Sequence, residues 1–219
     1  KQALRMLKLE RENKELHSKL KNNLHFDHIV AVSKAMQNIL SLIEKIKDSS
    51  EPVLISGESG VGKEIVARHI YERSQFYSQK FIAINCAAMP ANLLESELFG
   101  YERGAFTGAV KTTKGKLELG HQGLVFLDEI GEMPLELQSK LLRVLEDKKF
   151  FRLGGEKEIE IDFRLICATN RNLQQLIEQK KFREDLYYRL NVIPILIPPL
   201  RERPDDIPAI IHHIMEQFC

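Results

Sequence analysis

The residues best suited to chemistry stand in one glycine-rich stretch, GESGVGKE, at positions 57–64. Glycine adopts backbone angles that other residues avoid, so a loop with three glycines can turn successive N–H groups inward around a phosphate. Lys63 completes the spacing G-x-x-x-x-G-K and is placed to reach the outer phosphates of a nucleotide. The stretch therefore predicts a nucleotide-binding loop in which we expect these residues to contact the nucleotide: Gly57, Glu58, Ser59, Gly60, Val61, Gly62, Lys63 and Glu64.

Two acids are candidates for holding the Mg²⁺ ion that accompanies a nucleotide. Glu64 stands where Ser or Thr ordinarily ligates that metal, and a carboxylate can serve it directly or through water. Asp128 ends the apolar run at 123–127, as an acid ends the buried parallel strand beside the phosphates of many ATPases. Glu129 follows and is placed to polarise the attacking water. An exposed acidic turn is the alternative, and the apolar run directly before the acids argues against it.

A polar residue also follows another apolar run, at 165–168, where Thr169 and Asn170 stand next in the chain. Ligands bind α/β sheets at the carboxyl ends of parallel strands. Asn170 is therefore expected to hydrogen-bond the γ-phosphate or the lytic water.

Arg183 and Arg189 stand six residues apart in FREDLYYRL, at 182–190. That separation is about 240° around an α-helix, so both arginines cannot serve one site from one helical face. Either one of them is structural or the helix ends between them. Phosphoryl transfer gains greatly from an arginine supplied across a subunit boundary, and the alternative is two surface salt bridges with Glu184 and Asp185. The residues alone favour neither.

These side chains need a frame, and the apolar runs supply it. Runs at 52–56, 80–86, 123–129 and 164–170 predict strands, and helical periodicity follows the first three. A helix with Ser33 as its N-cap precedes the first strand. Alternating strands and helices predict the α/β class, a parallel sheet flanked by helices.

Two segments outside this alternation stand out. Residues 104–109, GAFTGA, are small with two glycines and suit neither a helix interior nor a strand, so they predict the tip of a loop. Phe106 either stands exposed as a protein-contact site or folds back onto the core, and composition leaves both open. Further along, Gly154-Gly155 predicts a turn with strand character on one side of it, in the stretch 150–162.

Composition excludes several classes of protein. The 219 residues are 43% hydrophobic and 29% charged, which is ordinary for a globular protein. A net charge of +1 provides no bulk attraction to nucleic acid or membranes. The three cysteines show no C-x-x-C spacing, so reduced thiols and a cytoplasmic location are expected. No apolar run reaches the roughly 18 residues of a membrane span, and a first residue other than Met suggests a longer parent protein.

The two ends carry separate signals. Residues 1–24 place apolar side chains at heptad spacing, with one asparagine in the seam: Met6, Leu9, Asn13, Leu16 and Leu20. This pattern favours a two-stranded coil over a single amphipathic helix packed on its own domain. Near the other end, prolines predict a connection out of the sheet domain, followed by one helix: Pro194, Pro198, Pro199, Pro204 and Pro208.

Taken together, five motifs resemble the central ATPase domain of bacterial enhancer-binding proteins, the sigma-54-dependent transcriptional activators of the AAA+ superfamily. The motifs are GESGVGKE, GAFTGA, LVFLDEIGEMP, FREDLYYRLNV and PPLRERPDDI, and the resemblance covers about residues 25–219. It implies a P-loop NTPase subdomain over 25–198, the start of a helical lid over 199–219 and a coiled linker over 1–24. The linker would join a regulatory domain, often of the two-component type, and could hold two subunits in an inactive dimer.

The resemblance also implies roles that spacing alone does not give. Glu64 is ordinary at its position in this family, and Asn170 matches the first sensor. Asn85 matches the asparagine that holds the catalytic glutamate, here Glu129, in a resting pose. Ile29 and Val30 match the adenine side of the site, and residues 153–156 match a second mobile loop. The contact with sigma-54 would be made by Gly104, Ala105, Phe106, Thr107, Gly108 and Ala109.

The function that the resemblance implies is ATP hydrolysis with Mg²⁺ in a ring, usually a hexamer, that remodels sigma-54 RNA polymerase. Arg183 and Arg189 match the paired arginines that reach the neighbouring subunit's ATP. DNA would be bound only by a helix-turn-helix domain that would follow residue 219, and no membrane contact is expected. Two alternatives stay open: another AAA+ remodelling ATPase, or a non-catalytic dimerisation module gated by ATP or ADP.

Overall fold

The computed structural model describes residues 29–218. The coiled linker expected over 1–24 lies outside these residues. The core is one five-stranded sheet built from β1 (Val53–Ser56), β2 (Phe81–Asn85), β5 (Leu124–Asp128), β8 (Arg164–Thr169) and β9 (Ile193–Leu196). All paired strands are parallel, in the order β2-β5-β8-β1-β9. This arrangement confirms the predicted α/β fold, a parallel sheet flanked by helices.

The central strands are apolar except at their ends, because both faces of the sheet are covered. Every residue of β8 is buried, and so are the first four of β5. Leu124 and Phe126 pack on one face and Val125 and Leu127 on the other. This two-sided burial is the reason that the strands read as continuous apolar runs rather than as alternating ones.

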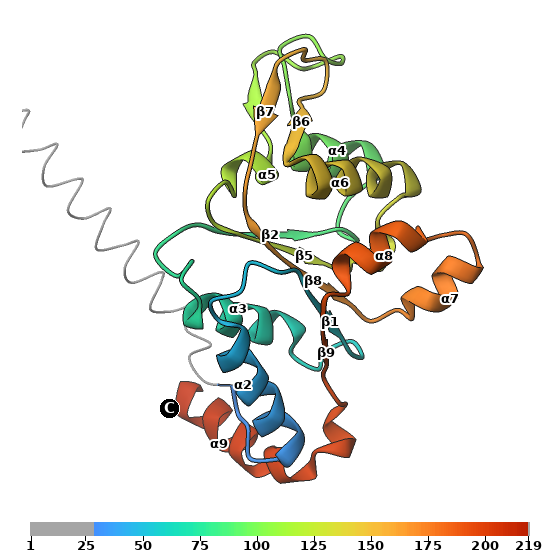
Figure 1. Cartoon of the computed structure of the whole chain (residues 1–219). Helices are drawn as coiled ribbons and strands as arrows, with labels where there is room; N and C mark the ends of the chain where they lie inside the picture. Colours follow the sequence, from blue (N-terminus) through green and yellow to red (C-terminus); the bar gives the residue numbers. More distant parts are fainter. Residues whose placement is uncertain (1–28, 219) are drawn as a thin grey trace, which may run out of the picture.

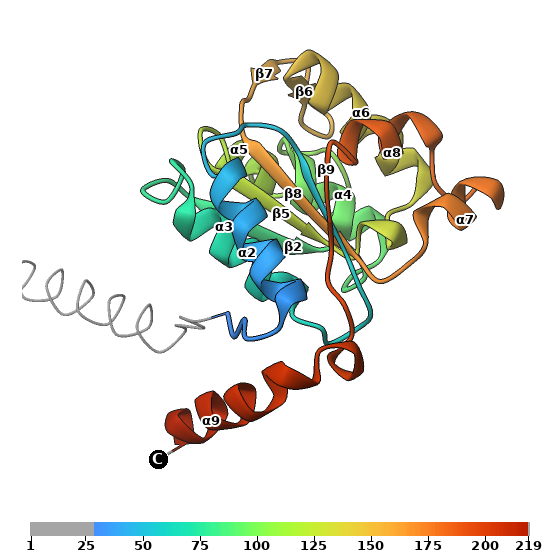
Figure 2. The same cartoon turned by 60° about the horizontal axis from the view of Figure 1, so that its bottom comes forward.

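Helices cover both faces of the sheet (Figures 1 and 2). α2 (Lys34–Ile46) and α3 (Lys63–Arg73) lie on one face, together with the apolar cluster of β1 and β5 that faces them. The other face carries α4 (Ala91–Phe99), α5 (Lys116–Leu119) and α6 (Leu135–Asp147). α7 (Leu173–Glu178) and α8 (Glu184–Leu190) follow β8 and lead into β9. Ser33 caps α2, as predicted, and accepts a hydrogen bond from Met36 N.

Two small antiparallel hairpins stand above α4, α5 and α6 at the top of Figure 1. β3 (Gly100–Tyr101) pairs with β4 (Thr113–Lys114), and β6 (Lys149–Phe151) pairs with β7 (Glu158–Glu160). The β6–β7 hairpin confirms the predicted turn near Gly154-Gly155. A bridge between Tyr101 and Leu153 joins the two hairpins. They therefore form one projecting unit, which carries residues 104–109 on one of its connections.

The prolines after α8 do not all lie outside the sheet. Pro194 lies within β9, so its assignment to the outgoing connection was wrong. β9 is an edge strand, and Ile193 N and Ile197 N donate across to β1, so the position of Pro194 faces the open side, where no ladder donor is needed. Beyond β9 come the 3₁₀ turns η2 (Leu200–Glu202) and η3 (Pro204–Asp206), then α9 (Ile207–Phe218). Among residues 29–218, no helix is long and apolar enough to cross a bilayer.

Candidate nucleotide site

The glycine-rich loop connects the carboxyl end of β1 to the first turn of α3. Gly60 and Gly62 have φ angles of +79° and +99°, in the left-handed region that other residues avoid. Gly57 lies so close to β9 that a Cβ atom there would stand 2.9 Å from the Ile197 carbonyl oxygen. The loop therefore requires glycine at these positions, and it leads directly into the positive end of α3.

Lys63 is the first residue of α3, and its side chain is only 7% exposed. Its Nζ donates to the carbonyl oxygens of Gly57, at 3.1 Å, and Glu58, at 3.2 Å. The same nitrogen lies 3.6 Å from Glu129 Oε1. The ammonium is thus held at the centre of the loop, as the sequence motif predicts for a lysine that meets phosphate.

The two acids follow β5 at the edge of the sheet that carries the loop. Glu129 has a left-handed backbone, with φ of +51°, and its Oε2 accepts a hydrogen bond from Asn170 N at 3.2 Å. Asp128 Oδ1 accepts from Glu129 N at 3.0 Å. The structure therefore brings together Lys63, the adjacent Asp128 and Glu129, and Asn170, from three separate stretches of the chain.

Asn85 does not hold the residue that the resemblance implies. Its Nδ2 donates to Asp128 Oδ2 at 3.2 Å, while Glu129 contacts Lys63 and the Asn170 backbone. The reason is register: Asn85 pairs with Asp128 at the ends of adjacent strands β2 and β5, so their side chains meet directly. Asn85 is consequently a neighbour of the proposed metal ligand in this structure.

Burial and the adjacent Glu129 carboxylate raise the pKa of Asp128 above its ordinary value. Such a carboxylate gains from a nearby cation, which fits the predicted role as a Mg²⁺ ligand. Glu64 lies close enough to add to this effect, but its Oε1 forms a 2.8 Å ion pair with Arg68. No group of three His, Cys, Asp or Glu side chains that could hold a metal occurs within residues 29–218. A magnesium ion here would take its other ligands from phosphate and water.

A cavity of about 500 Å³ lies beside the glycine-rich loop, and its walls suit a nucleoside. Ile29 and Val30 line it, at the place where the resemblance puts the base. Apolar residues of α3 and α9 complete it, among them Ile65, Val66, Ile210 and Ile214. The apolar residues from α9 were not predicted, because only the spatial approach of that helix brings them here.

Two arginines beside this cavity also escaped prediction. Arg203 is 7% exposed; its Nη2 donates to Val61 O in the loop at 2.8 Å, and its Nη1 lies 3.8 Å from Asp206. Asp206 is fully buried and accepts from the backbone of Val32 and Ser33, at the start of α2. This chain of contacts ties the loop to both walls of the cavity. The residue spacing in RERPDD, at 201–206, gives no indication of these contacts.

Arg201 makes a contrasting contact at the surface. It pairs with Glu58 through two hydrogen bonds, of 2.8 and 2.6 Å, and both side chains are mostly exposed. The pair lowers the pKa of the Glu58 carboxyl through that bond with Arg201. Glu58 is therefore fixed to the η2 turn.

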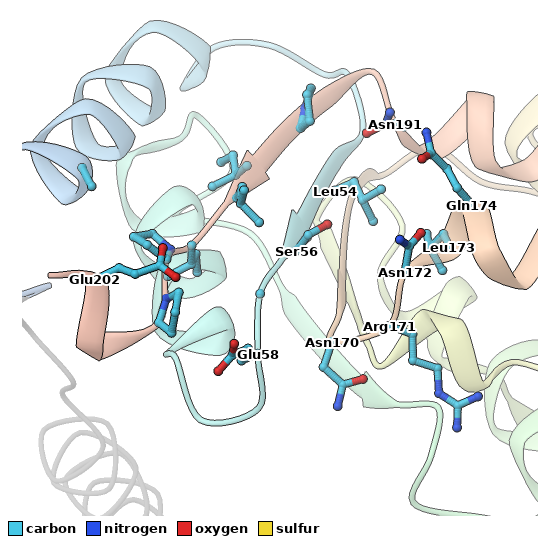
Figure 3. Close-up of a pocket in the computed structure, with 18 of the residues that line it drawn as sticks. Leu54, Ser56, Glu58, Asn170, Arg171, Asn172, Leu173, Gln174, Asn191 and Glu202 are labelled. Atoms are coloured by element: carbon cyan, nitrogen blue, oxygen red, sulfur yellow. The ribbon is translucent and has the colours of Figure 1, made fainter.

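A second cavity, of about 790 Å³, runs along the carboxyl ends of β1, β8 and β9. Figure 3 shows Glu58 and Asn170 together at one end of it, with Asn191 and Gln174 at the other. Asn170 thus lies between this cavity and Glu129, which its backbone contacts. The position agrees with the predicted role of Asn170 toward a phosphate or a water.

Arg183 is the N-cap residue of α8, so the helix begins just after it and only Arg189 lies inside the helix. The separation of about 240° calculated for one continuous helix therefore does not apply to this pair. The Arg183 guanidinium pairs with Asp185 at 2.7 and 3.0 Å and donates to Ser139 Oγ. One of the two surface salt bridges considered as an alternative is thus present. The Arg183 contact lowers the pKa of the Asp185 carboxyl.

Arg189 lies near the last turn of α8, at the other edge of the sheet. Its Nη2 donates to Leu145 O at 3.0 Å. It lines a cavity of about 310 Å³ with Pro52, Arg164 and Val192, which stand at or just before the amino ends of β1, β8 and β9. The glycine-rich loop follows the carboxyl end of β1. Arg189 therefore faces away from the nucleotide site of its own chain.

The 104–109 loop lies on the projecting hairpins, apart from the glycine-rich loop (Figure 1). Phe106 is 46% exposed and meets the Tyr101 ring edge-on, with centroids 5.0 Å apart, so it neither stands free nor enters the core. Below it, Arg152 of the second hairpin pairs with Glu102 and Glu118. The two hairpins are thus joined by charge as well as by backbone.

Comparison with known proteins identifies the family. The sequence pattern of the family described as "Sigma-54 interaction domain" matches residues 29–196. The chain belongs to this family. That stretch holds the five-stranded sheet, the glycine-rich loop, both acids, the 104–109 loop and both arginines. The family consists of AAA+ ATPase domains, and the fold described above is that of such a domain.

Relatives with curated names are transcriptional regulators. The chain is 49% identical to the regulatory protein AtoC of Escherichia coli over 216 residues, which are 99% of this chain and 47% of AtoC. It is 52% identical to the formate hydrogenlyase transcriptional activator FhlA of the same species over 200 residues, 91% of this chain and 29% of FhlA. The chain thus spans about a third to a half of the relatives that it matches.

Solved structures agree with this family membership. The NtrX protein of Brucella abortus superposes with a TM-score of 0.87 and 37% identity over 99% of this chain and 47% of NtrX. A structure of NtrX in complex with ATP gives a TM-score of 0.85 and 36% identity over 97% of this chain and 49% of NtrX.

Proposed function

We propose that this domain binds and hydrolyses ATP with Mg²⁺ in a ring of subunits, and that it uses the hydrolysis to remodel sigma-54 RNA polymerase through the 104–109 loop. The observation that carries the proposal is the placement of its parts. Lys63, Asp128, Glu129 and Asn170 lie together at the carboxyl ends of the strands. Arg189 lies at the amino ends of the strands. One subunit thus presents half of a phosphoryl-transfer site to each of two neighbours.

Within one subunit, the loop and Lys63 hold the phosphates and offset their charge. Glu129 orients the attacking water, and Asn170, which contacts Glu129 through its backbone, stands where it can bond the γ-phosphate. Asp128, assisted by Glu64, would hold Mg²⁺, which would supply positive charge against the charge that develops on the phosphates. Ile29 and Val30 contact the adenine, since they line the apolar cavity beside the loop.

The missing half comes from the neighbouring subunit. Arg183 and Arg189 approach its ATP, where each guanidinium stabilises charge that develops on the transferred phosphoryl group. The Arg183–Asp185 pair is exposed, so exchanging it for a phosphate costs about 1 kcal/mol or less. Hydrolysis therefore depends on assembly, for which a hexamer is the expected size.

The projecting hairpins convert the state of the site into movement of the 104–109 loop. Residues 153–156 of the second hairpin act with it, because Leu153 bridges to Tyr101 and Arg152 pairs with Glu102. Phe106 and Thr107 are the residues that meet sigma-54. In the inactive state, residues 1–24 would join two subunits into a dimer. Contact with DNA is assigned to a domain other than this one. The protein would act in the cytoplasm.

The test separates contact with sigma-54 from hydrolysis. Thr107→Ala should keep the ATPase rate within about twofold, since the loop lies apart from the nucleotide site, yet lose sigma-54 binding and open-complex formation. Ser41→Ala, which removes an exposed hydroxyl on α2, is the matched control and should keep both. Normal open-complex formation by Thr107→Ala would contradict the contact role and favour another AAA+ remodeller.

A further inference from the structure

Gln138 is a fully buried polar residue that the catalytic scheme above does not use. It lies in the first turn of α6, and its side chain makes three hydrogen bonds to backbone groups. Its Nε2 donates to Met133 O at 2.7 Å and to Lys181 O at 3.0 Å. Its Oε1 accepts from Arg183 N at 2.8 Å. One side chain thus contacts two segments that are far apart in the sequence.

These two segments each lead to a part of the proposed phosphoryl-transfer site. Met133 closes the 3₁₀ turn that begins after Glu129, and its N–H bonds Ile130 O within that turn. Lys181 and Arg183 flank Phe182, whose ring is buried in the core beneath α6 and α8. Gln138 therefore ties the turn after the acid pair to the backbone that carries Arg183.

The chemistry at this position calls for an amide. Two carbonyl oxygens need donors and one N–H needs an acceptor, and a glutamine side chain supplies both from one group. A carboxylate could accept from Arg183 N but would repel the two carbonyls, and an apolar side chain would leave all three groups unpaired in the core.

The anchored backbone contrasts with the tip of the same residue. The Arg183 side chain is 42% exposed, with its guanidinium at the surface against Asp185 and Ser139. Fixing the backbone of an exposed arginine leaves its tip free to change partner while its starting point stays constant. An arginine that must meet a phosphate on another subunit needs this combination, because small displacements at a reacting centre are costly.

We propose that Gln138 is a positioning residue for Arg183: it sets the backbone from which that arginine reaches the nucleotide of the neighbouring subunit. This inference rests on the proposed function, in which Arg183 acts across the interface. It predicts that the effect of losing Gln138 appears in the neighbour's site and not in its own.

Two variants test the position, with one control. Gln138→Met keeps the size and removes all three hydrogen bonds, and Gln138→Glu keeps the acceptor for Arg183 N. The control is Lys140→Met on the same helix, where the exposed ammonium pairs with Glu95. We expect Gln138→Met to lower kcat at least about tenfold with an unchanged nucleotide affinity. Gln138→Glu should lie between it and the wild type, and the control should match the wild type.

The deciding experiment mixes subunits. Glu129→Gln subunits keep Arg183 but cannot hydrolyse ATP, whereas Gln138→Met subunits keep their own acids but misplace Arg183. In a mixed ring, the Arg183 of a Glu129→Gln subunit can serve the ATP of a Gln138→Met subunit. The ATPase rate of this mixture should therefore exceed the sum of the rates of its two components at least about threefold. A parallel mixture of Arg183→Ala with Glu129→Gln subunits should show the same increase.

The outcomes separate this inference from the proposal on which it rests. If the Arg183→Ala mixture recovers and the Gln138→Met mixture does not, Gln138 acts within its own subunit and the inference is overturned alone. If the Arg183→Ala mixture fails to recover, the proposed role of Arg183 fails first. Thermal melting and light scattering show whether Gln138→Met folds and assembles. If it does not, Gln138→Glu takes its place in the mixture. If both Gln138 variants melt at the wild-type temperature but neither assembles, the inference is overturned.

Discussion

Two ion pairs at the candidate site differ in burial, although each joins a basic residue of the proposed catalytic set to an acid. Lys63 and Glu129 lie 3.6 Å apart with side chains 7% and 18% exposed. Arg183 and Asp185 lie 2.7 Å apart with side chains 42% and 46% exposed. The first pair is enclosed by the glycine-rich loop, and the second lies at the surface beside α6.

The difference supports the proposal that one subunit completes only part of the chemistry. The enclosed pair belongs to a set of groups already fixed to one another, including Asp128 and the Asn170 backbone. The exposed pair is weakly held, since surface pairs contribute only about 0–1 kcal/mol, and so Arg183 is available for another anion. We infer that the groups expected to meet the chain's own nucleotide are preorganised, whereas Arg183 can exchange Asp185 for a phosphate of a neighbouring subunit.

The largest effect should come from the exposed side. Arg183→Ala is expected to lower the ATPase rate roughly 10³-fold or more, because an arginine supplied in trans has that worth in related phosphoryl transfers. Nucleotide affinity should stay near that of the wild type, since Arg183 lies outside its own subunit's site. Steady-state rates and a fluorescent-nucleotide titration measure the two quantities. A loss below fivefold would show that Arg183 is only a surface partner of Asp185.

On the enclosed side, Glu129→Gln should lower the rate roughly 10²- to 10⁴-fold, as expected for loss of a general base. ATP binding should persist, because glutamine retains an oxygen to accept from Asn170 N. Glu132→Gln is the matched control: it lies three residues on and pairs with Arg171 at the surface. Single-turnover hydrolysis distinguishes the variants, and full turnover by Glu129→Gln would refute its role.

A second enclosed contact can be compared with a second exposed one. Arg203→Met should raise the dissociation constant for ATP about tenfold, because it breaks the charged hydrogen bond to Val61 O that holds the loop. Arg201→Met breaks the exposed pair with Glu58 and should change the constant less than twofold. Equilibrium titration measures both. Equal effects would remove the distinction between enclosed and exposed contacts.

The smallest expected effect comes from releasing Arg183 from its exposed pair with Asp185. Asp185→Asn frees Arg183 from its own chain, while the amide oxygen can still accept from Leu186 N. The rate per subunit at intermediate protein concentration should rise, by up to about fivefold, the worth of one exposed pair. A fall in that rate would show that Asp185 positions Arg183 for catalysis.

The sequence predicted the parts whose signal is local. Four strands of the sheet follow from continuous apolar runs, because parallel strands buried on both faces need no alternation. The loop, Lys63 and the acids follow from motif spacing that backbone geometry imposes. β9 was missed because Pro194 reads as a break, and only the open side of an edge strand makes it harmless.

Other features depend on three-dimensional proximity, which carries no local signal. The partner of Asn85 was assigned as Glu129 and proved to be Asp128, since strand register decides which side chains meet. Gln138 and Arg203 pair with backbone groups over 40 residues away, so neither spacing nor periodicity marks them.

In the proposed function, the two halves of the site meet only between subunits. The most direct measurement is the ATPase rate per subunit over a wide range of protein concentration, with molar mass determined by light scattering on the same samples. We expect the rate per subunit to rise with protein concentration in step with the appearance of a large assembly. A rate per subunit that stays constant while the molar mass increases would contradict this proposal, because each subunit would then hold a complete site.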